Sequence, residues 1–262
     1  MKNLHFTYEM LFEFSEPVRN HRFTLKCIPE SNECQFIEGV DLRIEPVPKY
    51  SESRDSFGNR EIYGMVEESH SMFHVKVEGT ALTGLDSCEK ALPSHQLGIF
   101  KYPSGYTKPG RYLKEYMASL SFAKNWSAYD KGVFLMHKIY EDFIYEKGVT
   151  TYLTTAEEAM ELGRGVCQDY AHILIALLRM LKIPARYVVG MMIGEGFSHA
   201  WVEMEADGKW YGLDATNNVL VDDNYIKISH GRDYDDCVVN KGVFTGMAKQ
   251  KQDIRVVVCD KQ

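Results

Sequence analysis

The sequence predicts an α+β protein, in which an N-terminal antiparallel β-sandwich precedes a unit with a central helix packed on an antiparallel sheet. Short strand-like runs separated by turn residues occupy positions 1 to about 90. Beyond them, apolar residues recur at helical spacing, and further strand-like runs follow a very apolar helical segment. The 262 residues, of which 45% are hydrophobic, are enough for two such units with a real core.

The N-terminal β domain is expected to span residues 1–90. Glu16-Pro17, the Pro-Glu-Ser-Asn segment at 29–32 and Phe57-Gly58-Asn59 favour turns between its strands. Strands this short and this closely spaced are typical of a small sandwich. The remaining residues, 91–262, are assigned to a second domain with a C-terminal extension. The expected N-terminal strands are 5–14, 21–28, 39–46, 61–67 and 72–78.

The second domain is expected to contain helices followed by strands. Thr155 and Glu158 form the pattern of a capping box, which predicts a helix start. Asp207-Gly208 predicts a tight hairpin turn, and Gly194-Glu195-Gly196 is expected to be a mobile loop or an ordinary turn. The expected helices are 133–145, one starting at 155, and the buried 166–181; the expected strands are 185–193, 199–205 and 209–214.

Cys167 differs from the other five cysteines because it begins the buried helix, next to Gly165. A thiol at that position faces unpaired helix N–H groups and the positive end of the helix dipole, which both favour the thiolate. The neighbouring glycines are expected to allow a sharp turn and the close approach of a substrate. A lone cysteine before a helix is more often a core residue, so the prediction depends on its partners.

The predicted hairpin supplies those partners. If its turn is at 207–208, Asp214 faces Trp201, and His199 is the diagonal neighbour of Asp214 on the same face. An imidazole beside a carboxylate is the base-and-orienter half of a catalytic triad. His199 is therefore predicted to accept the proton of Cys167, and Asp214 to orient the imidazole.

An oxyanion hole needs two donors, and the backbone N–H of Cys167 is expected to be one of them. Gln168 and Trp201 are candidates for the second by proximity alone. No metal or cofactor is expected. On a helix, His172 points about 140° away from Cys167, so it is assigned to packing, and Asp169 is assigned to capping the helix.

Net charge, hydrophobic patterning and cysteine spacing limit the classes of partner that we expect. The net charge of −7 argues against nucleic acid, and no apolar run is long enough to span a membrane or serve as a signal peptide. The scattered cysteines include no CxxC pair, and the expected location is cytoplasmic. A peptide, a protein or a small amide is the expected substrate.

Several segments resemble the core of the transglutaminase-like superfamily. The residues around Cys167, His199 and Asp214 carry this resemblance, and Gly231-Arg232-Asp233-Tyr234 is similar to bacterial members. Pro17-Val18 and 55–59 resemble the β domain that precedes the core in those members. The resemblance covers almost the whole chain and implies a papain-like arrangement, with a cysteine helix against a sheet that carries histidine and aspartate. The core segments are 165–172, 183–188, 198–203 and 210–217.

Together, the triad and the resemblance predict a thiol-dependent amide or peptide hydrolase, or an acyltransferase, that works through a thioester. Water is favoured as the acceptor, which would make the protein a cysteine protease or amidase. The alternatives are a transglutaminase that uses an amine, a non-enzymatic scaffold on the same fold, and an acyl-CoA-type acetyltransferase with the same triad.

Overall fold

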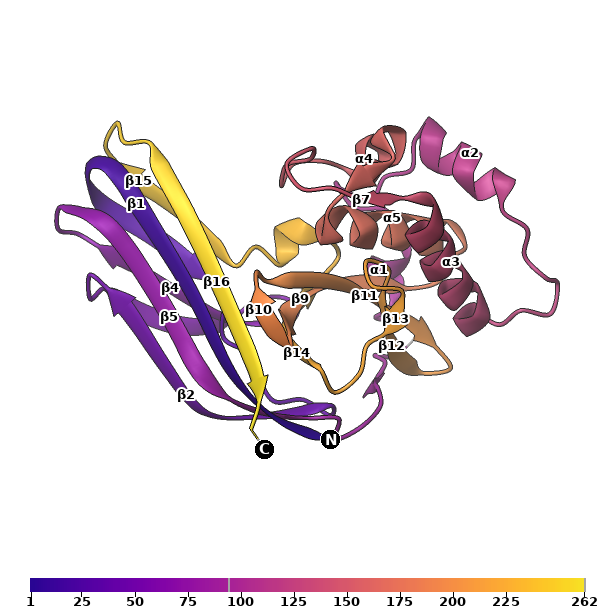
Figure 1. The fold of residues 1–262 in the computed structure, drawn as a ribbon, viewed down its shortest axis with the longest axis horizontal. Helices are drawn as coiled ribbons and strands as arrows, with labels where there is room; N and C mark the ends of the chain where they lie inside the picture. The colour runs from indigo at the N-terminus through magenta and orange to yellow at the C-terminus, as the bar shows by residue number, and fades with distance from the viewer. Residues whose placement is uncertain (94, 262) are drawn as a thin grey trace.

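The structure is a computed structural model that describes residues 1–93 and 95–261. Strands dominate it, and the α-helices lie between residues 98 and 180 (Figure 1). Figure 1 shows a layer of long strands that contains both ends of the chain, beside a smaller sheet that helices cover. Within the described residues, no helix is long and apolar enough to cross a membrane.

The elements follow one another in three groups. The first group is β1 (Lys2–Leu25), β2 (Gln35–Glu45), β3 (Lys49–Arg54), β4 (Arg60–Val66), β5 (His70–Thr83) and β6 (Glu89–Lys90). The second is α1 (Gly98–Lys101), α2 (Arg111–Ser119), α3 (Ala128–Asp142), β7 (Ile144–Tyr145), α4 (Ala156–Leu162), β8 (Arg164–Gly165) and α5 (Cys167–Met180). The third is β9 (Ala185–Met192), β10 (Gly194–Gly196), β11 (His199–Ala206), β12 (Lys209–Asp214), β13 (Val219–Leu220), β14 (Tyr225–Gly231), the 3-10 helix η1 (Tyr234–Asp236), β15 (Asn240–Thr245) and β16 (Gln250–Asp260).

β1 is one long strand where two were expected. The predicted break at Glu16-Pro17 is wrong, because the chain stays extended there and only shifts its register between Glu13 and Val18. A proline is tolerated at such an irregularity, where no ladder hydrogen bond is lost. The first half of β1 pairs with β5 and β16, and the second half pairs with β4 and β15. Both halves therefore belong to one curled sheet.

The C-terminal strands return to the start of the chain. β16 pairs with β1 from Leu4 to Phe14, and β15 pairs with its second half. What was expected to be an extension of the second domain therefore completes the N-terminal sheet. The domain boundary near residue 90 stays a prediction.

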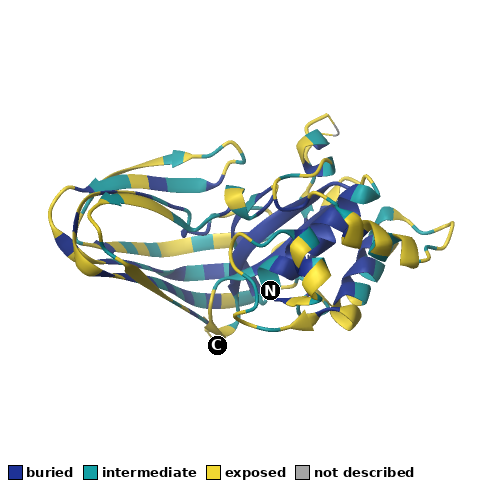
Figure 2. Ribbon diagram, turned by 90° about the horizontal axis from the view of Figure 1, so that it is seen from above, coloured by how far each residue is buried: buried dark blue, intermediate teal, exposed yellow. Residues whose placement is uncertain are grey.

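The curled sheet and the smaller sheet share one apolar core. Buried residues alternate with more exposed ones along β1, as the banded strands in Figure 2 show. Its buried side chains, such as Phe6 and Phe12, pack in one cluster with Met191 of β9 and with Ile226 and Ile228 of β14. The smaller sheet is therefore held against the larger one by apolar contact.

The turn predicted at 57–59 is closed by Asp55 and adds a polar link between the two sheets. Asp55 accepts hydrogen bonds from the backbone N–H groups of Phe57 and Asn59 at 2.8 and 3.0 Å, which closes the turn. Asn59 then bonds both backbone groups of His230 in β14, at 2.8 and 2.9 Å. The turn therefore faces the smaller sheet. These hydrogen bonds explain why Asp and Asn occur at positions 55 and 59.

The smaller sheet runs in the order β13-β12-β11-β9-β14, and β6 pairs with β12. The predicted helix over 166–181 is observed as α5, which is buried over most of its length and packs on β9 and β11. The capping box at Thr155 is confirmed. α3 begins at Ala128, earlier than expected, because Ser127 and Asp130 form a second capping box.

Candidate active site

The hairpin that carries His199 and Asp214 forms as predicted. Asp207 and Gly208 have φ values of 51° and 76°, the left-handed conformation that a two-residue hairpin turn requires. Val202 pairs with Leu213, which is the expected register. His199 Nε2 lies 2.7 Å from Asp214 Oδ2, so the diagonal pair is in direct contact.

Asp214 is fully buried and surrounded by hydrogen-bond donors. Its Oδ2 accepts from His199 Nε2 at 2.7 Å, from Asn217 Nδ2 at 2.7 Å and from the Tyr225 hydroxyl at 2.8 Å. Its Oδ1 accepts from the backbone N–H groups of Thr216 and Asn217. Burial raises the pKa of the Asp214 carboxyl, but these bonds outweigh it, so the net pKa is lowered and the carboxylate is charged.

His199 interacts with both Asp214 and Cys167. Because Asp214 engages Nε2, Nδ1 is the ring nitrogen left to face the Cys167 side chain. Burial lowers the pKa of His199, but the bonds to Asp214 and Cys167 outweigh it and raise the pKa to about 10. The imidazolium form is therefore favoured at neutral pH. Its stabilising contribution is complete below the unfolded pKa of about 6.5 and is lost as the pH rises through the folded pKa.

Cys167 is the first residue of α5, and a buried carboxylate holds the turn before it. Asp169 accepts hydrogen bonds from the Val166 backbone N–H and from the Thr150 hydroxyl, both at 2.7 Å. A Cβ at Gly165 would lie 2.3 Å from an Asp169 carboxylate oxygen. Gly165 is thus needed to make room for this carboxylate, which is a different reason from the expected approach of substrate.

An open cleft of about 420 Å³ gives access to Cys167 and His199. Tyr145 and Lys147 line it on one side, and Val256 of β16 lines it too. Its lining also includes Val166, Met192, Ile193, Gly194, Glu195, Gly196, Phe197 and Ser198. The nucleophile and base that were predicted from the sequence therefore share one solvent-accessible site.

Neither candidate for the second oxyanion donor lines this cleft. Gln168 Nε2 donates instead to the carbonyl of Tyr152 at 3.1 Å. The buried Trp201 stacks on His199, with ring centroids 6.4 Å apart, and lines a different cavity. Its ring fits because residue 190 is a glycine, where a Cβ would lie 2.3 Å from the indole. Trp201 therefore supports the His199 imidazole by stacking and does not line the cleft.

Tyr145 is one of the cleft residues that the sequence did not reveal. β7 pairs in parallel with β8, and this pairing sets Tyr145 opposite Gly165, two residues before Cys167. Burial and the charge of the Cys167 thiolate both raise the pKa of Tyr145, and Tyr145 lines the same cleft as Cys167. A strand pair of two residues each leaves no periodic pattern, so no sequence signal marks it.

His172 is a packing residue, as expected. It is buried between the rings of Tyr106 and Tyr187, with centroids 4.9 and 5.0 Å away, and accepts a hydrogen bond from the Tyr234 backbone. Burial and the charge of Arg179 lower its pKa to about 3, so it is neutral. Within residues 1–93 and 95–261, no group of three or more His, Cys, Asp or Glu side chains is placed to hold a metal ion.

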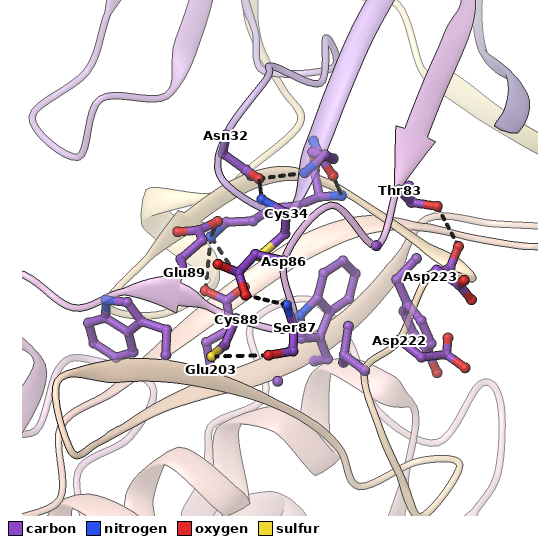
Figure 3. A pocket seen from close by; sticks show the side chains of 18 of the residues that line it. Asn32, Cys34, Thr83, Asp86, Ser87, Cys88, Glu89, Glu203, Asp222 and Asp223 are labelled. Atoms are coloured by element: carbon purple, nitrogen blue, oxygen red, sulfur yellow. Dashed lines mark hydrogen bonds and ion pairs between the residues drawn. The ribbon is translucent and has the colours of Figure 1, made fainter. Parts of the chain in front are cut away.

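A second cavity, of about 360 Å³, lies where the curled sheet meets the smaller one. Figure 3 shows Glu89 and Glu203 on its wall. Arg186 and Lys227 pair with both carboxylates, at 2.5 to 2.9 Å. Burial raises the pKa of Glu89, but the two cations outweigh it and lower the pKa to about 2. This buried charge cluster joins β6 to β9, β11 and β14.

Two sequence profiles match the chain. Residues 119–215 match the transglutaminase-like superfamily, and residues 4–81 match the bacterial transglutaminase-like N-terminal region. The first match contains Cys167, His199 and Asp214, and the second covers most of the strands before β6.

Related proteins and a solved structure agree with these profiles. Uncharacterized proteins of Mycobacterium tuberculosis and Mycobacterium bovis are 32% identical over 251 residues, covering 83% of this chain and 80% of theirs. A proposed cysteine protease from Cytophaga hutchinsonii, solved by crystallography, has a TM-score of 0.82 and 24% identity. That match covers 100% of this chain and 91% of the other. The fold is therefore transglutaminase-like.

Proposed function

Because the chain belongs to the transglutaminase-like superfamily, we propose that it is a thiol enzyme that cleaves amides through Cys167, His199 and Asp214, with water as the favoured acceptor. The observation that carries the proposal is the position of His199, which bonds Asp214 at 2.7 Å and lines one cleft with Cys167. Both neighbours raise the pKa of His199, which favours its charged form. The name of the Cytophaga hutchinsonii protein, a proposed cysteine protease, supports the same chemistry.

The proposed reaction has two halves. The Cys167 thiolate attacks the carbonyl carbon of an amide, and the His199 imidazolium gives its Nδ1 proton to the leaving amine. This leaves a thioester on Cys167 and a neutral imidazole. Water then attacks the thioester carbon as His199 takes its proton, and the acid leaves with regeneration of the thiolate–imidazolium pair. Asp214 stabilises the charged imidazole and keeps Nδ1 towards the sulfur.

Two donors are proposed to stabilise the tetrahedral oxyanion. The backbone N–H of Cys167 lies in the first turn of α5, where amides have no partner within the helix. The hydroxyl of Tyr145, which lines the same cleft as Cys167, is the proposed second donor.

Tyr145→Phe should lower kcat by about a hundredfold, because it removes one of these donors from the transition state. The rate at which iodoacetamide labels Cys167 should stay within about twofold, since alkylation forms no oxyanion. Steady-state kinetics and intact-protein mass spectrometry measure the two rates. Equal kcat values for the variant and the wild type would exclude Tyr145 as a donor.

The first test of the proposal is the pH dependence of Cys167 alkylation by iodoacetamide. Because His199 is charged across the neutral range, labelling should be fast below about pH 7 and change little up to about pH 9. His199→Ala removes the cation and should restore an ordinary thiol profile, with a rate that rises between about pH 7 and 9. Peptide mapping by mass spectrometry assigns the label.

Cys259→Ser provides the background for this test. Cys259 is exposed, whereas Cys27, Cys88 and Cys237 are buried. Burial and neighbouring carboxylates raise the pKa of Cys34 to about 12. Cys167 is therefore the site expected to label early. Slow labelling of Cys167 that His199→Ala leaves unchanged would contradict the thiol-enzyme proposal and favour a scaffold role.

A further inference from the structure

β10 is an edge strand beside the candidate nucleophile. Among the strands of the described residues, it pairs with β16 alone, so its other edge is free. Its residues are all exposed and line the same cleft as Cys167. Within residues 1–93 and 95–261, no backbone hydrogen bond outside the β10–β16 ladder involves positions 194–198. The N–H and C=O groups on that edge are thus open to pairing.

Because two of the three residues of β10 are glycines, this part of the cleft wall carries few side chains. Among residues 1–93 and 95–261, nothing lies within 4 Å of a Cβ built at Gly194 or Gly196. Gly194 has φ 118° and so requires glycine, but Gly196 does not have a positive φ. Gly196 pairs with Val256, which lines the cleft, so a side chain at 196 would point into the cleft. Neither packing nor backbone strain accounts for Gly196, whereas the approach of another backbone does.

The surroundings of β10 suit an extended chain. Glu195 pairs with Arg255 at 2.9 Å, which fastens β10 to β16. Phe197 and Tyr145 are 61% and 48% exposed at the cleft, and Lys147 Nζ lies 5.2 Å from the Phe197 ring centroid. These rings offer apolar contact to the side chains of a peptide that lies in the cleft.

We propose that the substrate is a polypeptide in an extended conformation, which adds as a strand to the free edge of β10 and presents one of its amides to Cys167. The proposal rests on the proposed function only in making Cys167 the nucleophile. Strand addition takes its affinity from main-chain hydrogen bonds and its specificity from pockets for alternate side chains. A three-residue edge is about 10 Å long, so it pairs with the few residues nearest the reacting amide.

Binding to the Cys167→Ala variant tests the pairing without any chemistry. The probe is a fluorescein-labelled hexapeptide with valine at alternate positions, compared with a twin that carries methyl groups on its backbone nitrogens. Methylation removes the N–H donors and keeps the side chains. Fluorescence anisotropy should give a Kd at least about tenfold higher for the twin. Equal Kd values would overturn the proposal.

Gly196→Val tests the same site from the protein side, in the Cys167→Ala background. The valine should project into the cleft and raise the Kd of the unmethylated peptide at least about tenfold. Gly105→Val is the matched control, because a Cβ there also meets nothing within 4 Å and its φ is not positive. Wild-type affinity in Gly196→Val would contradict pairing at β10.

A folding control and the labelling rate separate the possible failures. The melting temperature of Gly196→Val should stay close to that of the wild type, because among the described residues nothing lies within 4 Å of a Cβ built there, and the labelling rate of Cys167 is measured in the wild-type chain. If Gly196→Val misfolds, the comparison of the methylated and unmethylated peptides on the Cys167→Ala chain still tests the proposal. Methylation-sensitive binding with an inert Cys167 would refute the proposed chemistry and leave the edge site standing. A reactive Cys167 together with equal binding of the two peptides would refute strand pairing at β10 and leave the proposed chemistry standing.

Discussion

Cys167→Ala should lower the turnover of an amide substrate by at least about 10⁴-fold, because loss of a nucleophile removes the whole covalent pathway. A pool of fluorogenic peptide amides is a suitable substrate. In the wild type, acid-quenched samples should contain an acyl adduct on Cys167 that hydroxylamine removes, as a thioester requires. The variant should show no adduct and should keep its melting temperature, since Cys167 is only half-buried.

The same assay separates hydrolysis from acyl transfer. Adding dansylcadaverine offers the thioester an amine in place of water. If hydrolysis dominates, most of the product remains the free acid, whereas a transglutaminase would give mainly the dansyl amide. Full activity in Cys167→Ala would contradict the thiol mechanism itself.

Asp214→Asn should lower kcat by about 10³- to 10⁴-fold. Both oxygens of this carboxylate face donors: His199, Asn217 and Tyr225 on Oδ2, and two backbone N–H groups on Oδ1. An asparagine therefore directs its NH₂ group at donors in either orientation. The charged imidazole also loses its partner, so the pKa of His199 should fall towards its ordinary value of about 6.5.

Kinetics and an NMR titration of His199 measure these two effects. Asp222→Asn is the control, because it makes the same chemical change at an exposed carboxylate whose hydrogen bonds, within the part of the chain that the structure describes, come from Asn224. A fall in melting temperature without a shift in the His199 titration would show that Asp214 is structural only. That outcome would contradict its role in the triad.

Much of the site could be predicted because its signals are local or strictly periodic. Turn chemistry at Asp207-Gly208 sets the register of the hairpin, and the period of two along a strand then brings His199 beside Asp214. The helix that carries Cys167 follows from its apolar content, and Thr155 marks the start of the helix before it. The catalytic roles of these residues stay predictions that the variants above test.

The predictions fail where pairing between segments far apart in the chain decides the local structure. β1 stays continuous through Pro17 because other strands pair with it on both sides of the irregularity. The Gly194–Gly196 segment, expected to be a loop or turn, is a strand because β16 returns from the C-terminus to pair with it. Tyr145 reaches the cleft through a strand pair too short to leave a pattern.

By itself, the sequence determined the helix of Cys167, the hairpin of His199 and Asp214, and the resemblance to a family. These features arise within a few tens of residues, where backbone preference and side-chain periodicity act directly. The tertiary structure alone decided the shape of the cleft. It brings Tyr145 to the cleft, leaves one edge of β10 free, and makes Gly165 the residue that leaves room for the Asp169 carboxylate. Those depend on contacts between segments far apart in the chain, and no local pattern encodes such contacts.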